Sequence, residues 1–108
     1  MRNQKVCILD YGSGNVGSVY NLLNRLNYNA KISNDSLDIK NSSHLILPGV
    51  GAFGVSVEKV KSKIPIDLLA EEVKIKKKPF LGICVGMQIL AEKGFEFGEN
   101  EGLGWIKG

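Results

Sequence analysis

The chain has 108 residues, of which 44% are hydrophobic and 23% are charged. This composition is that of one ordinary globular domain, and the length leaves no room for a second one. The net charge of +3 is too small to favour nucleic acid as a partner, and no apolar run approaches the ~20 residues of a membrane span. Glycine is the unusual residue, because 13 glycines exceed the usual share of ~7%.

The two cysteines, Cys7 and Cys84, lie far apart in a chain whose first residues have no signal-peptide pattern. Two cysteines permit one disulfide, but a reduced, cytoplasmic setting fits this usage better. His44 is the only histidine, so no cysteine–histidine cluster forms and the sequence predicts no metal site.

The first half of the chain alternates apolar segments with a helical pattern. An apolar run at 6–9 is typical of a strand buried on both faces, and a glycine-rich turn follows it. Apolar residues then recur at helical spacing from Val16 to Leu26, with Ser13 or Asn15 as the cap. A short strand is expected at 30–33, followed by a polar loop that extends to Ser43.

The second half repeats this order. A strand at 44–47 ends at proline and glycine, and a helix near 55–61 is interrupted by Pro65. A further helix is expected at 66–77, then a strand at 79–84, a helix at 85–93 and one more candidate strand at 103–106. Strands that alternate with helices predict an α/β fold, with a mostly parallel sheet and helices on both faces.

Gly12, Gly14 and Gly17 fit the G-x-G-x-x-G pattern of dinucleotide-binding proteins, and Asp35 follows about 20 residues later. Such a protein would bind the NAD pyrophosphate at the helix N-terminus and the ribose through Asp35. Asp10 argues against this interpretation, because a carboxylate beside the phosphate site would repel the ligand. A turn whose glycines allow positive φ and close packing is the favoured alternative, since a lone match is weak.

A second motif, G-x-C-x-G, places Cys84 between Gly82 and Gly86, after a strand and before a helix. It is the thiol counterpart of the G-x-S-x-G nucleophile elbow. The glycines remove Cβ atoms that would clash in a sharp turn, and the helix that follows favours a thiolate. The amide of Val85 would face a developing oxyanion. Cys7, inside an apolar strand, is predicted to be a buried structural cysteine.

Residues 48–51 follow the third strand with the sequence Pro-Gly-Val-Gly. In a parallel sheet they lie at the same edge as Cys84. The proline stiffens the entry, and the two glycines allow a peptide to turn its N–H toward the site. On local chemistry alone, a second oxyanion donor and a simple strand-to-helix turn fit equally well.

Together these motifs resemble the class I glutamine amidotransferases, in which a cysteine elbow hydrolyses glutamine and passes ammonia to a partner. Residues 8–15, 47–54, 82–88 and 101–104 are similar to one branch, the glutaminase subunits of imidazole glycerol phosphate synthase in histidine biosynthesis. The resemblance implies a flavodoxin-like amidotransferase domain that needs no cofactor. Residues 1–108 would be its N-terminal part, incomplete at the C-terminus.

The resemblance implies a role for each matching residue. Cys84 would attack the side-chain carbonyl of glutamine, form a γ-glutamyl thioester and release ammonia. The amides of Val85 and Val50 would hold the oxyanion, the latter after a peptide rearrangement that the partner controls. Asn15 would lie at the interface with that partner, a cyclase subunit with a (β/α)₈ barrel. Three further residues would contact the substrate: Gly49, Gly51 and Gln88.

The same mechanism needs a general base and a carboxylate that orients it. In the family both come from a His-x-Glu pair far beyond the elbow, which these 108 residues do not contain. His44 is expected at the start of its strand, at the edge opposite Cys84, as a surface or capping residue. We therefore expect negligible glutaminase activity from this chain alone.

Two alternatives remain open from the sequence. A paralogous glutaminase, supplying ammonia for amidination of a surface sugar, would carry the same motifs in this region. A module that binds NAD through Gly12, Gly14 and Gly17 belongs to another functional class.

Overall fold

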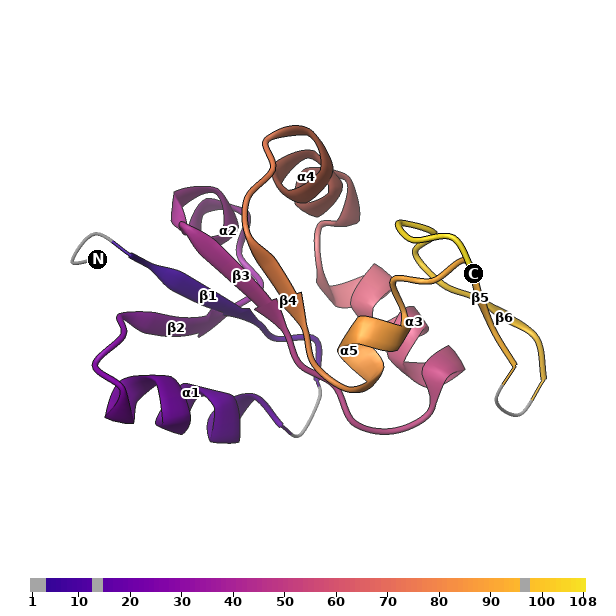
Figure 1. Cartoon of the computed structure of the whole chain (residues 1–108), viewed down its shortest axis with the longest axis horizontal. Coiled ribbons are helices and arrows are strands. Elements are labelled where there is room, and N and C mark those ends of the chain that lie inside the picture. The colour runs from indigo at the N-terminus through magenta and orange to yellow at the C-terminus, as the bar shows by residue number, and fades with distance from the viewer. Residues whose placement is uncertain (1–3, 13–14, 96–97) are drawn as a thin grey trace.

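A computed structural model of the chain describes residues 4–12, 15–95 and 98–108. Four parallel strands form one sheet in the order β2-β1-β3-β4 (Figure 1). Their bounds are Val6–Leu9 for β1, Ala30–Ser33 for β2, His44–Leu47 for β3 and Phe80–Gly82 for β4. This order is that of flavodoxin-like sheets, and the predicted α/β fold is confirmed.

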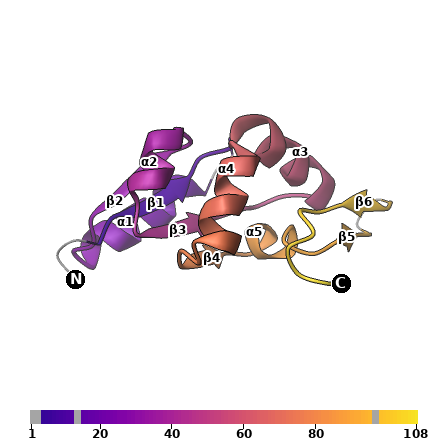
Figure 2. The same ribbon diagram turned by 90° about the horizontal axis from the view of Figure 1, so that it is seen from above.

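The helices and a small hairpin complete the chain. The helical elements are α1 Val16–Arg25, α2 Ser36–Asn41, α3 Phe53–Lys63, α4 Ile66–Ala70, the π-helical turn η1 Glu71–Ile75 and α5 Val85–Gln88. Strands β5 Lys93–Gly94 and β6 Asn100–Glu101 form a separate antiparallel pair. Both views place this hairpin at the end of the molecule away from α1 (Figures 1 and 2). No described helix is long and apolar enough to cross a lipid bilayer.

Alternate residues of the strands point to two faces of the sheet, and helices cover both, as predicted. Cys7 and Leu9 belong to the main core together with Ile39 of α2, Val60 of α3 and Leu69 of α4. Figure 1 shows α1 below the strands, with α2 and α4 above them. Helix α1 covers its face of the sheet less completely, because none of its residues is buried.

The polar loop predicted up to Ser43 is wrong, because Ser36–Asn41 form α2. The Asp35 side chain caps this helix by accepting a hydrogen bond from the Leu37 amide at 3.4 Å. Only Ile39 of this helix is buried. A single apolar anchor produces no helical periodicity, so the helix could not be read from the pattern.

The helix predicted at 66–77 is also different, because α4 passes into the π-helical turn η1. Within this turn the Glu72 carboxylate is buried, and it binds Lys76 at 2.8 Å and Lys78 at 2.7 Å. The Lys78 amide donates a hydrogen bond to the Glu72 carbonyl at 3.0 Å. The sequence pattern of one amphipathic helix does not reveal a carboxylate that faces inward.

The helix predicted at 85–93 ends early, since α5 covers Val85–Gln88 only. The carbonyl oxygens of the next turn instead accept hydrogen bonds from the C-terminal segment at 103–106. The Leu103 amide donates to the Ile89 carbonyl at 2.7 Å, and the Ile106 amide donates to the Leu90 carbonyl at 2.9 Å. The predicted strand at 103–106 is likewise reduced to a single bridge between Ala91 and Ile106. Long-range hydrogen bonds therefore replace the last turns of the predicted helix.

Candidate active site

Cys84 lies in a sharp turn between β4 and α5, as the sequence predicts. Its backbone has φ 55° and ψ −123°, a conformation that L-residues seldom adopt. The thiol is free and the residue is exposed. Backbone strain of this kind concentrates at functional sites, where it holds a side chain away from its neighbours.

The two glycines of the elbow are required by close backbone packing. A Cβ on Gly82 would lie 2.7 Å from the Cα of Met87, and 2.8 Å from the Gly86 carbonyl oxygen. A Cβ on Gly86 would collide with the carbonyl oxygen of Leu47. Gly86 therefore allows the start of α5 to pack directly against the end of β3, which fixes the position of Cys84.

The loop at 48–51 lies beside this elbow, because β3 and β4 are neighbours and Leu47 is in register with Gly82. The Ile83 amide donates to the Leu47 carbonyl at 3.0 Å. Gly49 is buried, and a Cβ there would lie 2.9 Å from the Gly86 amide nitrogen. The predicted meeting of these two loops at one sheet edge is confirmed.

Two backbone amides at this edge, those of Val85 and Val50, have no acceptor among the described residues. Among the described residues, the Val85 N–H donates no hydrogen bond, and its side chain is buried, which holds the peptide in place. Within the same part of the chain, the Val50 N–H has no acceptor either, and this residue is exposed. Unpaired amides near a nucleophile are the ordinary components of an oxyanion hole.

A hollow of about 550 Å³ lies next to the elbow helix. Gln88 lines it from α5, and Phe53 lines it from the start of α3. The remaining wall consists of Ala91 together with Lys93, Gly94 and Phe95 of the hairpin. The predicted substrate residue Gln88 therefore borders this hollow, whereas Cys84 and the loop at 48–51 do not line it.

Tyr11 is a site residue that the sequence analysis did not single out. Its side chain is 1% exposed, and its hydroxyl donates a hydrogen bond to the Pro48 carbonyl at 2.5 Å. It reaches the loop at 48–51 from the loop after β1, and no local pattern in the sequence links these two segments.

The first glycine motif does not have the features of a dinucleotide site. The Asp10 carboxylate accepts a hydrogen bond from the Gly12 amide at 3.2 Å, where a phosphate would need to bind. A Cβ on Gly17 would meet no atom within 4 Å, so no close contact between helix and strand requires a glycine at this position. Asp35 caps α2. Ser13 and Gly14 lie outside the described residues, and Asn15 occupies the N-cap position of α1.

His44 lies at the start of β3, and its Nδ1 is 2.8 Å from the Ser43 hydroxyl. Cys84 follows the carboxyl end of the neighbouring parallel strand β4. His44 and Cys84 therefore lie at opposite ends of the strands, His44 at the amino end and Cys84 at the carboxyl end. The predicted separation of His44 from Cys84 is confirmed. Over residues 4–12, 15–95 and 98–108, no group of three or more His, Cys, Asp or Glu side chains could hold a metal ion.

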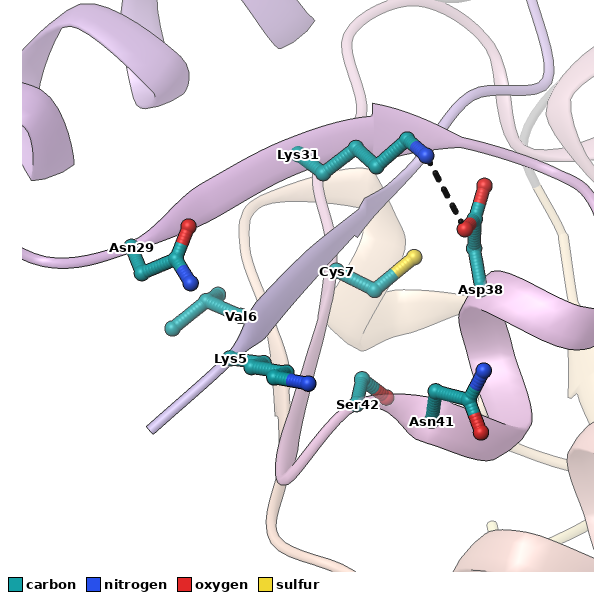
Figure 3. A pocket seen from close by; sticks show the side chains of 8 residues that line it. All are labelled: Lys5, Val6, Cys7, Asn29, Lys31, Asp38, Asn41 and Ser42. Atoms are coloured by element: carbon teal, nitrogen blue, oxygen red, sulfur yellow. Dashed lines mark hydrogen bonds and ion pairs between the residues drawn. The ribbon is translucent and has the colours of Figure 1, made fainter. Parts of the chain in front are cut away.

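Cys7 is the buried structural cysteine that the sequence predicts. Burial, and the nearby Asp38 carboxylate, raise the pKa of its thiol to about 11. It borders a polar cavity of about 210 Å³ beside β2, across which Lys31 and Asp38 form an ion pair at 3.0 Å (Figure 3). This cavity lies on the β2 side of the sheet, whereas Cys84 follows β4 on the other side.

We expect iodoacetamide to alkylate Cys84 and to spare Cys7 in the folded chain. At a pH near the ordinary thiol pKa of ~8.5, a thiol with a pKa of about 11 is less than roughly 1% ionised. Peptide mass spectrometry after a timed reaction measures both sites. The Cys84→Ala chain should take up label only after unfolding in urea, and comparable labelling of both cysteines in the folded chain would contradict the assignment.

Comparisons with known proteins agree with this geometry. A sequence model of the family glutamine amidotransferase class-I matches residues 7–99. Imidazole glycerol phosphate synthase subunit HisH of Caldanaerobacter subterraneus is 53% identical over 104 residues, which cover 94% of this chain and 49% of that protein. Subunit HisH 2 of Vibrio vulnificus is 46% identical over 105 residues, which cover 96% and 49%.

A solved structure supports the fold alone. A Listeria monocytogenes protein with the provisional name peptidase E matches with a TM-score of 0.68 at 14% identity, over 83% of this chain and 50% of that one. The chain spans about half the length of the curated relatives that it matches.

Proposed function

Because this chain belongs to the class-I glutamine amidotransferase family, we propose that it is the nucleophile-bearing part of a glutaminase subunit of imidazole glycerol phosphate synthase. The observation that carries the proposal is the strained elbow at Cys84, packed against the loop at 48–51. Residues 1–108 form the N-terminal portion of a single domain in this account. The activity supplies ammonia for histidine biosynthesis, in the cytoplasm, where free thiols such as Cys7 and Cys84 persist.

The reaction begins when the Cys84 thiolate attacks the side-chain carbonyl carbon of glutamine. A C–S bond forms, and the carbonyl oxygen becomes an oxyanion that accepts from the amides of Val85 and Val50. The C–N bond then breaks, the nitrogen takes up a proton, and ammonia leaves a γ-glutamyl thioester. Water hydrolyses the thioester to glutamate and restores the thiol. The base that moves these protons lies outside the 108 residues, since His44 is at the far edge of the sheet.

The substrate and partner sites follow from the same arrangement. We assign glutamine binding to Gln88, which lines the hollow beside α5, and to Gly49 and Gly51 of the loop at 48–51. Gly51 has φ +102°, a conformation that suits a loop able to reorient its peptides. Asn15, at the start of α1, contacts the partner, a cyclase subunit with a (β/α)₈ barrel that consumes the ammonia.

An open apolar surface supports a domain that continues beyond these residues. A groove of about 370 Å³ lies between α1 and β4, and Leu23, Ile46 and Leu81 line it. Leu81 is 55% exposed on β4, which pairs only with β3 among the described strands. We assign the cover of this groove to the remainder of the domain, because the matched relatives are about twice as long as the chain.

The test joins this chain to the remainder of the Caldanaerobacter relative, which is 53% identical over the matched region. We expect the joined chain to hydrolyse glutamine in the presence of that organism's cyclase subunit. Residues 1–108 alone should release glutamate at the background rate, because they lack the base. Glutamate release is measured by a coupled dehydrogenase assay.

The joined Cys84→Ala chain is the matched control, and its activity should fall by at least 10³-fold, the order expected for loss of a nucleophile. A folded joined chain without glutaminase activity would overturn the proposal. Strong activity from residues 1–108 alone, lost on Cys84→Ala, would overturn the argument about the missing base. Rescue of a histidine auxotroph by the joined chain assigns the pathway, and lack of rescue by an active joined chain assigns the paralogous sugar-amidination role instead.

A further inference from the structure

We infer that Tyr11 is a positioning residue for the loop at 48–51, an inference that rests on the proposed glutaminase function. Tyr11 lies in the loop between β1 and α1, and its side chain is 1% exposed. Its hydroxyl donates to the Pro48 carbonyl at 2.5 Å. The loop after β1 thus holds the loop after β3 by a buried hydrogen bond.

This bond fixes the peptide that directly precedes the proposed oxyanion donor. The Pro48 carbonyl belongs to the peptide linking Pro48 to Gly49, and the next amide along the chain is that of Val50. Gly49 has no side chain to hold it, and Gly51 has φ +102°. A segment with glycine on both sides of Val50 needs an anchor from outside, and the Tyr11 hydroxyl supplies one.

The same hydroxyl lies where three segments meet. A Cβ built on Gly49 would collide with both the Tyr11 hydroxyl and the Val85 side chain, and would lie 2.9 Å from the Gly86 amide nitrogen. The Tyr11 hydroxyl therefore borders the narrow space between the loop at 48–51 and the elbow at Cys84. Displacement of Tyr11 would allow Gly49 to move, and the Val50 amide with it.

The position of Tyr11 also connects the two proposed ends of the site. Asn15, the proposed partner contact, lies in the same connection between β1 and α1. The Asp10 carboxylate accepts from the Gly12 amide at 3.2 Å, and the Asn34 amide donates to the Asp10 carbonyl at 3.0 Å. A partner that moves this connection would shift Tyr11 and, through its hydrogen bond to Pro48, the loop at 48–51.

The experiment compares two reactions of Cys84 in the 108-residue chain. Acylation by p-nitrophenyl acetate passes through a tetrahedral oxyanion, whereas alkylation by iodoacetamide does not. Both consume the thiolate, so the fraction of thiolate cancels in the ratio of the two rates. The ratio therefore reports oxyanion stabilisation without the missing base, and mass spectrometry of the Cys84 peptide measures both rates.

We expect Tyr11→Phe to lower this ratio by about 5-fold or more, which is less than the ~10²-fold effect of deleting an oxyanion donor outright. Tyr28→Phe, at a tyrosine 41% exposed, is the matched control and should leave the ratio unchanged. Cys7 serves as an internal reporter of unfolding, because it is 2% exposed in the folded chain.

A lower ratio with Cys7 unlabelled supports the inference. A lower ratio accompanied by labelling of Cys7 contradicts it, since Tyr11 would then only hold the fold together. An unchanged or higher ratio in Tyr11→Phe, with a parent ratio above that of N-acetylcysteine, overturns the role of Tyr11 and leaves the proposed function intact. A parent ratio no greater than that of N-acetylcysteine also overturns the inference, because the loop at 48–51 would then form no oxyanion site in this chain for Tyr11 to position, whereas the proposed function is decided by the glutaminase assay of the joined chain with its partner.

Discussion

Gly86→Ala is expected to destabilise the chain by about 3 kcal/mol, at the upper end of the cost of overpacking. The new Cβ would collide with the carbonyl oxygen of Leu47, a backbone atom at the end of a central strand. A flexible side chain could rotate away from such a contact, but β3 cannot move without loosening its pairing with β1 and β4. Urea unfolding followed by the fluorescence of Trp105, the only tryptophan, measures the change.

Gly17→Ala is the matched control for this substitution. Gly17 lies inside α1, and a Cβ there would meet no atom within 4 Å. Alanine is the better helix former, so this change should stabilise the chain by about 0.5–1 kcal/mol. Equal unfolding midpoints for the two variants would contradict the close packing of the elbow against β3.

Lys78→Met is expected to destabilise the chain by about 2–4 kcal/mol, because it removes one of the two ammonium partners of a buried carboxylate and a hydrogen-bond donor to each of two carbonyls. The Lys78 ammonium lies 2.7 Å from the Glu72 carboxylate, whose side chain is 2% exposed. It also donates to the Ile39 carbonyl at 2.8 Å and to that of Lys40 at 3.1 Å, at the C-terminal end of α2. Lys76 still binds Glu72 in the variant, which keeps the loss within this range.

The urea midpoints of this variant and of Lys74→Met, an exposed lysine one turn away, test the assignment. The control should change stability by less than about 0.5 kcal/mol. A loss of similar size in both variants would show that general charge, and not the buried pair, accounts for the effect.

The same pair predicts how stability depends on acid. Hydrogen bonds from Lys76 and Lys78 lower the pKa of Glu72 below its ordinary value. A carboxylate with a depressed folded pKa contributes stability that is present above its unfolded pKa of about 4.3 and is lost as the pH falls through the folded value. Lys78→Met should therefore lose less stability than the parent between neutral pH and about pH 3, and urea midpoints across that range measure the difference.

Local patterns were sufficient for the sheet. The strands at 6–9 and 44–47 are short apolar runs between turn residues and form as predicted, and the less apolar strand at 30–33 forms as well. The strand predicted at 79–84 forms only at Phe80–Gly82. The helix α2 was missed, since one buried residue, Ile39, anchors it. The helix α5 was predicted too long, because amides of the C-terminal segment at 103–106 donate to the carbonyls that would have accepted the next helical hydrogen bonds. Contacts between distant segments, which no local pattern encodes, decided both cases.

The candidate site divides in the same way. The elbow at Cys84 follows from a motif whose glycines have a steric cause, and the structure contains that cause in the contacts of Gly82 and Gly86. Tyr11 could not be predicted, because its importance depends on a hydrogen bond to Pro48, a residue in another loop. Asp35 was weighed as a ribose ligand in the alternative interpretation, but it caps a helix that the pattern did not reveal.

If Cys84 carries the acyl group of glutamine during the reaction, the mass of the Cys84 peptide must increase by that of a γ-glutamyl group. The joined chain would be mixed with glutamine and quenched in acid within one turnover, since acid preserves a thioester. We predict a γ-glutamyl adduct on Cys84 that disappears at longer times as glutamate accumulates, and no adduct on Cys7. Glutamate release with Cys84 unmodified throughout, or undiminished release by the Cys84→Ala chain, would contradict the account.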